Sequence, residues 1–278
     1  MAGSMVYRLK VADLSAPHMV PFRAAMAAAQ DRTDNESYNW IAGFHGAPGW
    51  YCWHHQISRR TPLQARLFLP WHRAYLWWLE QALQDRAVDL PDELRDLDIA
   101  LPWWDWTQVP TIPPAYDTEE IDGASNPLYA SHAMVPTANP PIDHVTTRAP
   151  GSNPRARLPT YDDIFHEGTG VLADPEWASF SDRLEDFHDD VHGWVDGDMG
   201  SLATAAFDPV FFAHHCTIDR LWYLWQVNNG NGGIPRDLLD LELLPFGKRV
   251  SDVLDVQRLG YEYAQTSVEI PIEGGPDA

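Results

Sequence analysis

The sequence has few cysteines, few basic residues and no long apolar run, and each shortage excludes a class of protein. Two cysteines in 278 residues, Cys52 and Cys216, cannot form a disulfide framework for a chain of this size. The 19 basic residues are outnumbered by 40 acidic ones, which gives a formal net charge of −21. Because so negative a surface repels phosphate backbones and anionic headgroups, we expect no nucleic-acid and no membrane partner. No apolar stretch approaches the roughly 20 residues that span a bilayer.

Internal repeats and low-complexity tracts are also missing, and we expect no secretory leader. The N-terminal stretch MAGSMVYRLKVADL has no apolar core of the kind that directs export. The localisation therefore stays open, with a slight preference for the cytoplasm.

What the sequence does have is an excess of tryptophan and histidine, 13 and 12 residues, arranged with helical periodicity. Apolar residues that recur every three or four positions predict helices over 17–30, 70–86, 175–195 and 207–228. Wide apolar helix faces must be buried against one another, so we expect a mainly α fold with a four-helix bundle core.

The segment 102–159 has a different texture, because it holds 11 of the 23 prolines and few apolar periods. We expect long, proline-rich irregular loops there that cross the bundle. Since Trp-rich helices resume after it, we expect one domain over residues 1–278.

Histidines on the predicted apolar stripes point to a metal site inside the bundle. His188 and His192 share a helix face, and His72 and His215 lie on the stripes of two other helices. A single inward histidine is usually a hydrogen-bonded core residue, but four on three helices are better explained by a metal. His45 and His54 are two further candidates upstream. Imidazoles without carboxylates suit copper, and a bundle core has room for two ions.

Six short strings then give the sequence a family resemblance: FHG (44–46), LFLPWHRAYL (67–76), LPWWDWT (101–107), the 184–194 stretch with HxxxH, DPVFFAHHCTIDRLW (208–222) and LGYEY (259–263). In this order they resemble the type-3 copper proteins, which comprise tyrosinases, catechol oxidases and molluscan hemocyanins. The YEY tyrosines are expected to pair with an N-terminal arginine, here Arg8. We expect no C-terminal lid domain, because the chain stops soon after this motif.

The resemblance implies two copper ions and six histidine ligands. His214 is expected to be structural, and His55 is the alternative to His54. The ligands implied for copper A are His45, His54 and His72, and those for copper B are His188, His192 and His215.

Cys52 and His54 match the pair that forms a thioether bridge in some relatives, with residues 56–64 as an insertion. A bridge would fix one imidazole before the metal arrives. Two alternatives stay open, namely a small buried Cys52 and a disulfide to Cys216.

Residues around the metals are also carried over from the resemblance. Phe211, Gly193 and Met199 are expected in the substrate pocket. Glu185 is expected to hold a water that takes the phenol proton, with Asp189 beside it, although either can be an ordinary solvated carboxylate. Asp219 is expected to orient a ligand histidine or to pair with Arg220.

The implied function is a dicopper polyphenol oxidase that uses O2 to oxidise o-diphenols or o-aminophenols to o-quinones. Slower ortho-hydroxylation of monophenols is expected beside it, because Asp189 stands where efficient monophenolases often have asparagine. A small phenol is the expected partner, and a copper-delivery helper protein stays open. The alternatives are a hemocyanin-like reversible O2 carrier and a binding module that has lost its metals.

Overall fold

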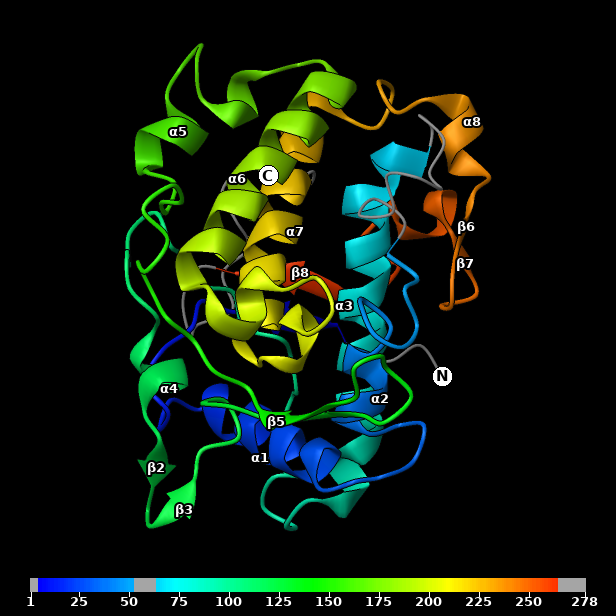
Figure 1. Cartoon of the computed structure of the whole chain (residues 1–278). Helices are drawn as coiled ribbons and strands as arrows, with labels where there is room; N and C mark the ends of the chain where they lie inside the picture. Colours follow the sequence, from blue (N-terminus) through cyan, green and yellow to red (C-terminus); the bar gives the residue numbers. More distant parts are fainter. Residues whose placement is uncertain (1–4, 53–63, 265–278) are drawn as a thin grey trace.

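The computed structural model describes residues 5–52 and 64–264, and four long helices dominate it (Figure 1). Helix α3 contacts the other three, and α6 also packs on α7. With 43% helix and 10% strand, the predicted mainly α fold with a four-helix core is confirmed. The long helices are α1 (Met19–Gln30), α3 (Phe68–Asp85), α6 (Trp177–Val195) and α7 (Val210–Asn229).

The predicted apolar stripes are the faces by which these helices pack. On α6, Trp177, Phe180 and Leu184 are at most 1% exposed. Helix α3 begins two residues before the expected Pro70, which therefore lies in the first turn, where a missing N–H leaves no intrahelical bond unmade. Helix α7 ends at Asn229 because Gly230 takes a positive φ of 65°.

The segment 102–159 is less irregular than predicted. It contains α4 (Pro114–Asp117), the hairpin of β2 (Glu120–Ile121) and β3 (Ala124–Ser125), and the hairpin of β4 (His132–Val135) and β5 (Ile142–Val145). These strands have two to four residues, too short for an alternating pattern to be recognised among prolines. Other short elements include α2 (Tyr38–Ala42), α5 (Tyr161–Phe165), α8 (Arg236–Leu239), β6 (Glu242–Leu243) and β7 (Lys248–Arg249).

The two ends of the described chain are joined by a parallel ribbon. Strand β1 (Val6–Arg8) pairs with β8 (Tyr261–Tyr263), with Val6 opposite Tyr261. Figure 1 shows β8 in the middle of the molecule, beside α7 and α3. Within residues 5–52 and 64–264, no helix has the length and apolar character of a membrane span.

Candidate metal centre

Two groups of metal-ligating side chains lie in the core, and within each group the potential ligand atoms are no more than 4.8 Å apart. The first group joins the loop after α2 to α3, and the second joins α6 to α7. Every member is buried except His192, which is half-buried. The first group is His45, Cys52 and His72, and the second is His188, His192, His214 and His215.

The groups meet through their rings. His72 and His215 are stacked, with ring centroids 4.2 Å apart and planes inclined by 15°. His45 lies 6.4 Å from His215, and His72 lies 5.9 Å from His188, measured between centroids. One centre is therefore built from three helices and the loop after α2.

Backbone and carboxylate acceptors fix the tautomer of three histidines. Nδ1 of His72 donates to the Phe68 carbonyl four residues earlier, and Nδ1 of His192 donates to the Met199 carbonyl, each at 2.8 Å. Nδ1 of His188 donates to Oδ1 of Asp189 at 3.0 Å. Because a neutral imidazole carries one proton, each of these rings presents a lone pair on Nε2.

The Nε2 atoms of the second group face one another. Nε2 of His215 lies 3.3 Å from Nε2 of His188 and 3.2 Å from Nε2 of His192. Two of these nitrogens already present lone pairs, and a neutral His215 can donate to only one of them. A cation bound by all three removes the conflict. The donor set therefore fits a metal that prefers imidazole, and copper is such a metal.

Burial keeps three histidines of the second group, His192, His214 and His215, in the neutral form that binds metals. Removal from water lowers the pKa of His192 and lowers the pKa of His214 and His215 well below the ordinary value. Neighbouring histidines lower the pKa of the last two further. These rings are therefore neutral near pH 7, as a metal ligand must be.

His214 also lies within ligand distance in this group, although the sequence suggested a structural role. Its ring stacks on His188 with centroids 5.2 Å apart, whereas Nε2 of His215 points at both α6 histidines. This arrangement favours His215 as the third ligand.

A hollow of about 280 Å³ opens at the centre. Of the residues expected in the substrate pocket, Gly193 and Met199 line the hollow, whereas Phe211 does not line it and is fully buried against the histidine rings. Phe211 lies 4.0 Å from His215 and 4.9 Å from His45 between centroids. The lining residues are His45, His188, Asp189, His192, Gly193, Met199, Gly200 and Leu202.

The two carboxylates expected to hold water lie on α6, at different distances from the surface. Glu185 is half-buried, and its charge acts on Cys52. Asp189 is exposed, lines the hollow and accepts a hydrogen bond from Nδ1 of His188. It therefore has the ligand-orienting role that the sequence assigned to another aspartate.

The predicted contacts of that other aspartate, Asp219, are wrong. Its carboxylate contacts neither a ligand histidine nor Arg220 among the described residues, but accepts from Arg73, Arg8, Tyr261 and Tyr263. One turn after His215, its carboxylate lies among side chains of α3, β1 and β8. The expected pairing of the YEY tyrosines with Arg8 is confirmed, since Arg8 bonds to Tyr263 at 3.1 Å and lies 3.5 Å over the Tyr261 ring.

Both cysteines are buried, and the structure does not contain the disulfide between Cys52 and Cys216. Sγ of Cys52 lies 3.7 Å from Nε2 of His72. Burial, and secondarily the charge of Glu185, raises the pKa of the Cys52 thiol. The thioether partner His54 and its alternative His55 lie outside the described residues.

Four histidines matched no expected ligand, and each makes a local contact away from the two groups. His18 bonds to the Lys10 carbonyl, His132 to Asp143, His144 to Asp198, and His166 to Thr169.

Sequence reasoning missed the groups that orient the ligands and one close backbone contact. The Phe68 carbonyl could have been predicted from its spacing to His72 on a helix, but the Met199 carbonyl lies on a loop without a periodic signal. A Cβ on Gly46 would lie 2.2 Å from the Leu202 carbonyl oxygen. The glycine of the FHG string thus lets the loop that lines the hollow pass directly over the residue after His45.

Comparison with known proteins gives this centre a context. The family model for the common central domain of tyrosinase matches residues 35–228. The chain is 27% identical over 284 residues to hemocyanin β-C chain unit G of Helix pomatia, covering 92% of this chain and 65% of that one. It is 29% identical over 322 residues to polyphenol oxidase 2 of Agaricus bisporus, covering 84% and 56%. The chain thus spans less than two thirds of either relative.

A solved structure of a functional unit from octopus hemocyanin has the same fold. It superposes with a TM-score of 0.68 at 25% identity, covering 94% of this chain and 68% of that one.

Proposed function

The chain belongs to the tyrosinase family of type-3 copper proteins, and on that premise we propose that it oxidises o-diphenols or o-aminophenols to o-quinones with O2. Slower ortho-hydroxylation of monophenols is the second proposed activity. The observation that carries the proposal is the hollow of about 280 Å³, because His45, His188 and His192 lie in its wall. A small aromatic ring that enters it reaches the rings that would hold the metals.

The ligands that we propose for copper A are His45, His54 and His72, and those for copper B are His188, His192 and His215. When bound, the copper pair supplies the two-electron redox chemistry between O2 and the phenol.

The chain's own residues position the substrate and exclude water. Phe211 covers the rings of His45 and His215 from inside the core, so that side of the centre is dry. Gly193 lies in the wall of the hollow, and Met199 and Leu202 add apolar surface. An aromatic substrate would therefore lie with its ring on apolar groups and its hydroxyl toward the histidines.

The substrate's hydroxyl must also lose a proton. A carboxylate that acts directly or through one water is a suitable base. We assign this task to Glu185, half-buried on α6, with Asp189 at the edge of the hollow. Asp189 also holds His188 in the tautomer that presents Nε2 to the metal. A change at Asp189 should therefore affect both the metal and the proton.

A reversible O2 carrier is the second candidate, because hemocyanins are among the relatives. A carrier needs its metal pair covered against phenols, whereas the described residues leave ligand histidines in the wall of a hollow. This observation favours the oxidase. Delivery of copper by a helper protein stays a prediction.

The test compares copper-loaded wild type with His215→Ala and a matched control, His132→Ala. His215 is buried in the second group, whereas His132 is exposed and pairs with Asp143 on the β4–β5 hairpin. The wild type and His132→Ala should each bind two coppers and consume O2 with catechol while quinone absorbance rises. His215→Ala should lose copper B and this activity.

Reversible O2 binding that catechol does not discharge would identify a carrier. Equal copper content in His215→Ala and the wild type would contradict the ligand assignment.

A further inference from the structure

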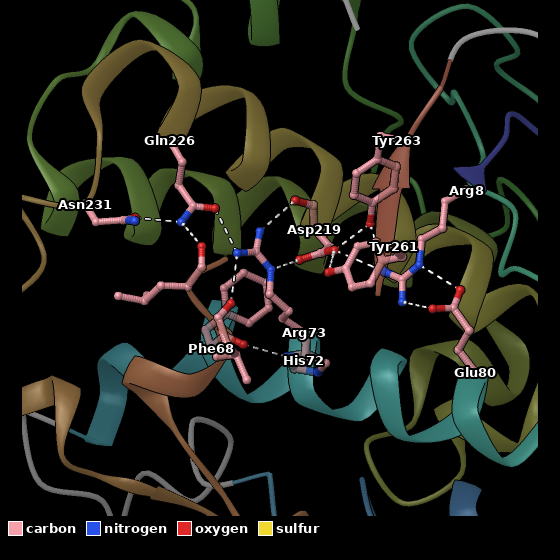
Figure 2. Close-up of polar contacts among 12 residues, drawn as sticks. Arg8, Phe68, His72, Arg73, Glu80, Asp219, Gln226, Asn231, Tyr261 and Tyr263 are labelled. Atoms are coloured by element: carbon pink, nitrogen blue, oxygen red, sulfur yellow. Dashed lines mark hydrogen bonds and ion pairs between the residues drawn. The ribbon is translucent and has the colours of Figure 1, made fainter. Parts of the chain in front are cut away.

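A buried ionic cluster lies where α3, α7, β1 and β8 meet, one turn along α7 from His215, and none of its side chains lines the hollow (Figure 2). Its members are at most 3% exposed, and they join both ends of the described chain to α3 and α7. We call it the Asp219 cluster. It consists of Arg8, Arg73, Glu80, Asp219, Tyr261 and Tyr263.

The Asp219 carboxylate is held from several directions at once. Oδ1 accepts from Nε of Arg73 at 2.5 Å. Oδ2 accepts from Nη1 of Arg8 at 3.1 Å and from the hydroxyls of Tyr261 and Tyr263 at 2.7 and 2.5 Å. The two arginines lower the pKa of Asp219 against the effect of burial, so the group is ionised and fixed.

Arg73 contacts α7 along one face. Besides its bond to Asp219, its guanidinium lies 3.6 Å over the Trp222 ring, and Nη1 donates to Oε1 of Gln226 at 2.8 Å. These partners are three and four positions apart on α7 and so share a face. Because the guanidinium is planar and rigid, these contacts fix the position of α3 both along α7 and around it.

Both ends of this contact are close to proposed metal ligands. Arg73 directly follows His72 on α3, and Asp219 lies one turn after His215 on α7. His72 and His215 are the two ligands whose rings stack across the groups, with centroids 4.2 Å apart. The ion pair and the ring stack therefore join the same two helices at nearly the same level.

We propose that Arg73 and Asp219 are positioning residues that set the separation of His72 and His215, and hence the spacing of the two metal ions. The inference rests on the proposed function, since it takes these histidines to be ligands of a copper pair. Arg8 and the tyrosine hydroxyls hold the aspartate in place while Arg73 spans the helices.

The test replaces Arg73 by lysine, which keeps the charge and loses the rigid fork. The matched control is Arg148→Lys. Arg148 is also nearly buried, bonds to Asp208 through Nε and Nη2, and donates to backbone carbonyls, but it lies outside α3 and α7. Both variants should unfold at a lower temperature than the wild type.

Only Arg73→Lys should change the metal pair. Two cupric ions held at a short fixed spacing by a shared ligand couple magnetically and give almost no EPR signal. We expect Arg73→Lys to bind as much copper as the wild type, with an EPR-visible fraction larger by about an order of magnitude. Its kcat for catechol should fall about 10²-fold with little change in KM, as expected for misplaced reacting groups. EPR-visible copper that is equal in Arg73→Lys and Arg148→Lys would overturn the proposal.

A milder variant decides the question if Arg73→Lys does not fold. Tyr263→Phe removes one bond to Oδ2 of Asp219 and leaves both helices intact. It should show a smaller rise in EPR-visible copper, and a wild-type spectrum would overturn the proposal.

The result for the wild type separates the failure of the positioning role from the failure of the proposed function. If the wild type itself fails to bind a coupled copper pair, the proposed function fails, and the positioning role falls with it.

Discussion

The carboxylate of Asp189 faces both the hollow and the neighbouring ligand, His188. It lines the hollow, and its Oδ1 accepts the Nδ1 proton of the adjacent His188. An asparagine there could still accept this proton through its carbonyl oxygen, but it would lose the charge and gain N–H donors. The change from aspartate to asparagine therefore tests the environment of the phenol proton while leaving the histidine tautomer satisfied.

We expect Asp189→Asn to raise kcat/KM for a monophenol relative to the matched o-diphenol, by about tenfold. The reason is that a monophenol, with a pKa near 10, depends on a base more than a catechol does. An amide could orient the water that we propose for Glu185 without competing for its proton. The measurement is kcat/KM for both substrates in wild type and variant.

The control for this prediction is Asp190→Asn, one position further along α6. Asp190 carries a similar charge but does not line the hollow. If both variants raise the monophenol-to-diphenol ratio of kcat/KM equally, the general loss of negative charge is responsible, and Asp189 does not control the reaction.

Cys52 allows a direct test of the thioether, with Cys216 as an internal reference. If the Cys52–His54 bridge forms, intact copper-matured protein should be lighter than calculated by a pair of hydrogen atoms, which pass to an oxidant such as O2. A thiol reagent under denaturing, non-reducing conditions should then label Cys216 alone. No disulfide joins the two cysteines in the structure, so labelling of both would exclude the bridge and reopen the choice between His54 and His55.

Among the connecting elements, the loop after α2 and the loop before α7 come into close backbone contact at Gly46. A Cβ there would lie 2.2 Å from the Leu202 oxygen and 2.6 Å from the Ala203 oxygen. The amide of Ala47 also donates to the Ala203 carbonyl at 3.2 Å. The ligand loop and the wall of the hollow are therefore held at a separation that only glycine allows.

We expect Gly46→Ala to lower the free energy of unfolding by about 1–3 kcal/mol, because backbone must move to admit the methyl group. KM for catechol should change as well, since Leu202 lines the hollow. Denaturant unfolding and steady-state kinetics measure the two effects. Gly232→Ala is the matched control, because a Cβ there meets nothing within 4 Å. Equal unfolding free energies for the two variants would contradict the prediction.

At the level of elements, the helices were predictable from sequence and their partners were not. Apolar periodicity located α1, α3, α6 and α7 to within a few residues, because each buries a wide face. The same periodicity could not show which side chains contact the Asp219 carboxylate. Its partners Arg8 and Tyr263 come from strands 211 and 44 positions away, and such pairings are set by tertiary packing.

For the whole molecule, the buried histidines make stability depend on pH and on copper. Burial lowers the pKa of His192, His214 and His215 in the folded state, so below the ordinary value of 6.5 the unfolded state binds more protons. The contribution of these neutral histidines to the free energy of unfolding is fully present above pH 6.5. It is lost as the pH falls from 6.5 toward the lower pKa values of the folded state. Protons also compete with copper for these nitrogens.

We expect the melting temperature of the copper-free protein to fall between pH 7 and pH 5. Copper at about 100 times its Kd should add about 2.7 kcal/mol of stability at pH 7, and less at pH 5. Calorimetric scans with and without copper at both pH values measure this. An increment from copper that is the same at pH 5 and pH 7 would show that the metal is not bound through these histidines.

The pairing of β1 with β8 also has a consequence for the order of assembly. Arg8 and Tyr263 are 255 positions apart, so synthesis at ordinary rates separates their appearance by tens of seconds. Closing so long a loop is slow, and contacts of this kind form late in folding. The histidines on α3, α6 and α7 can therefore meet before Tyr261 and Tyr263 reach Asp219. A metal captured in that interval would be held by helices whose relative position is not yet fixed, and docking of the last strand would turn a readily exchanged ion into a firmly held one.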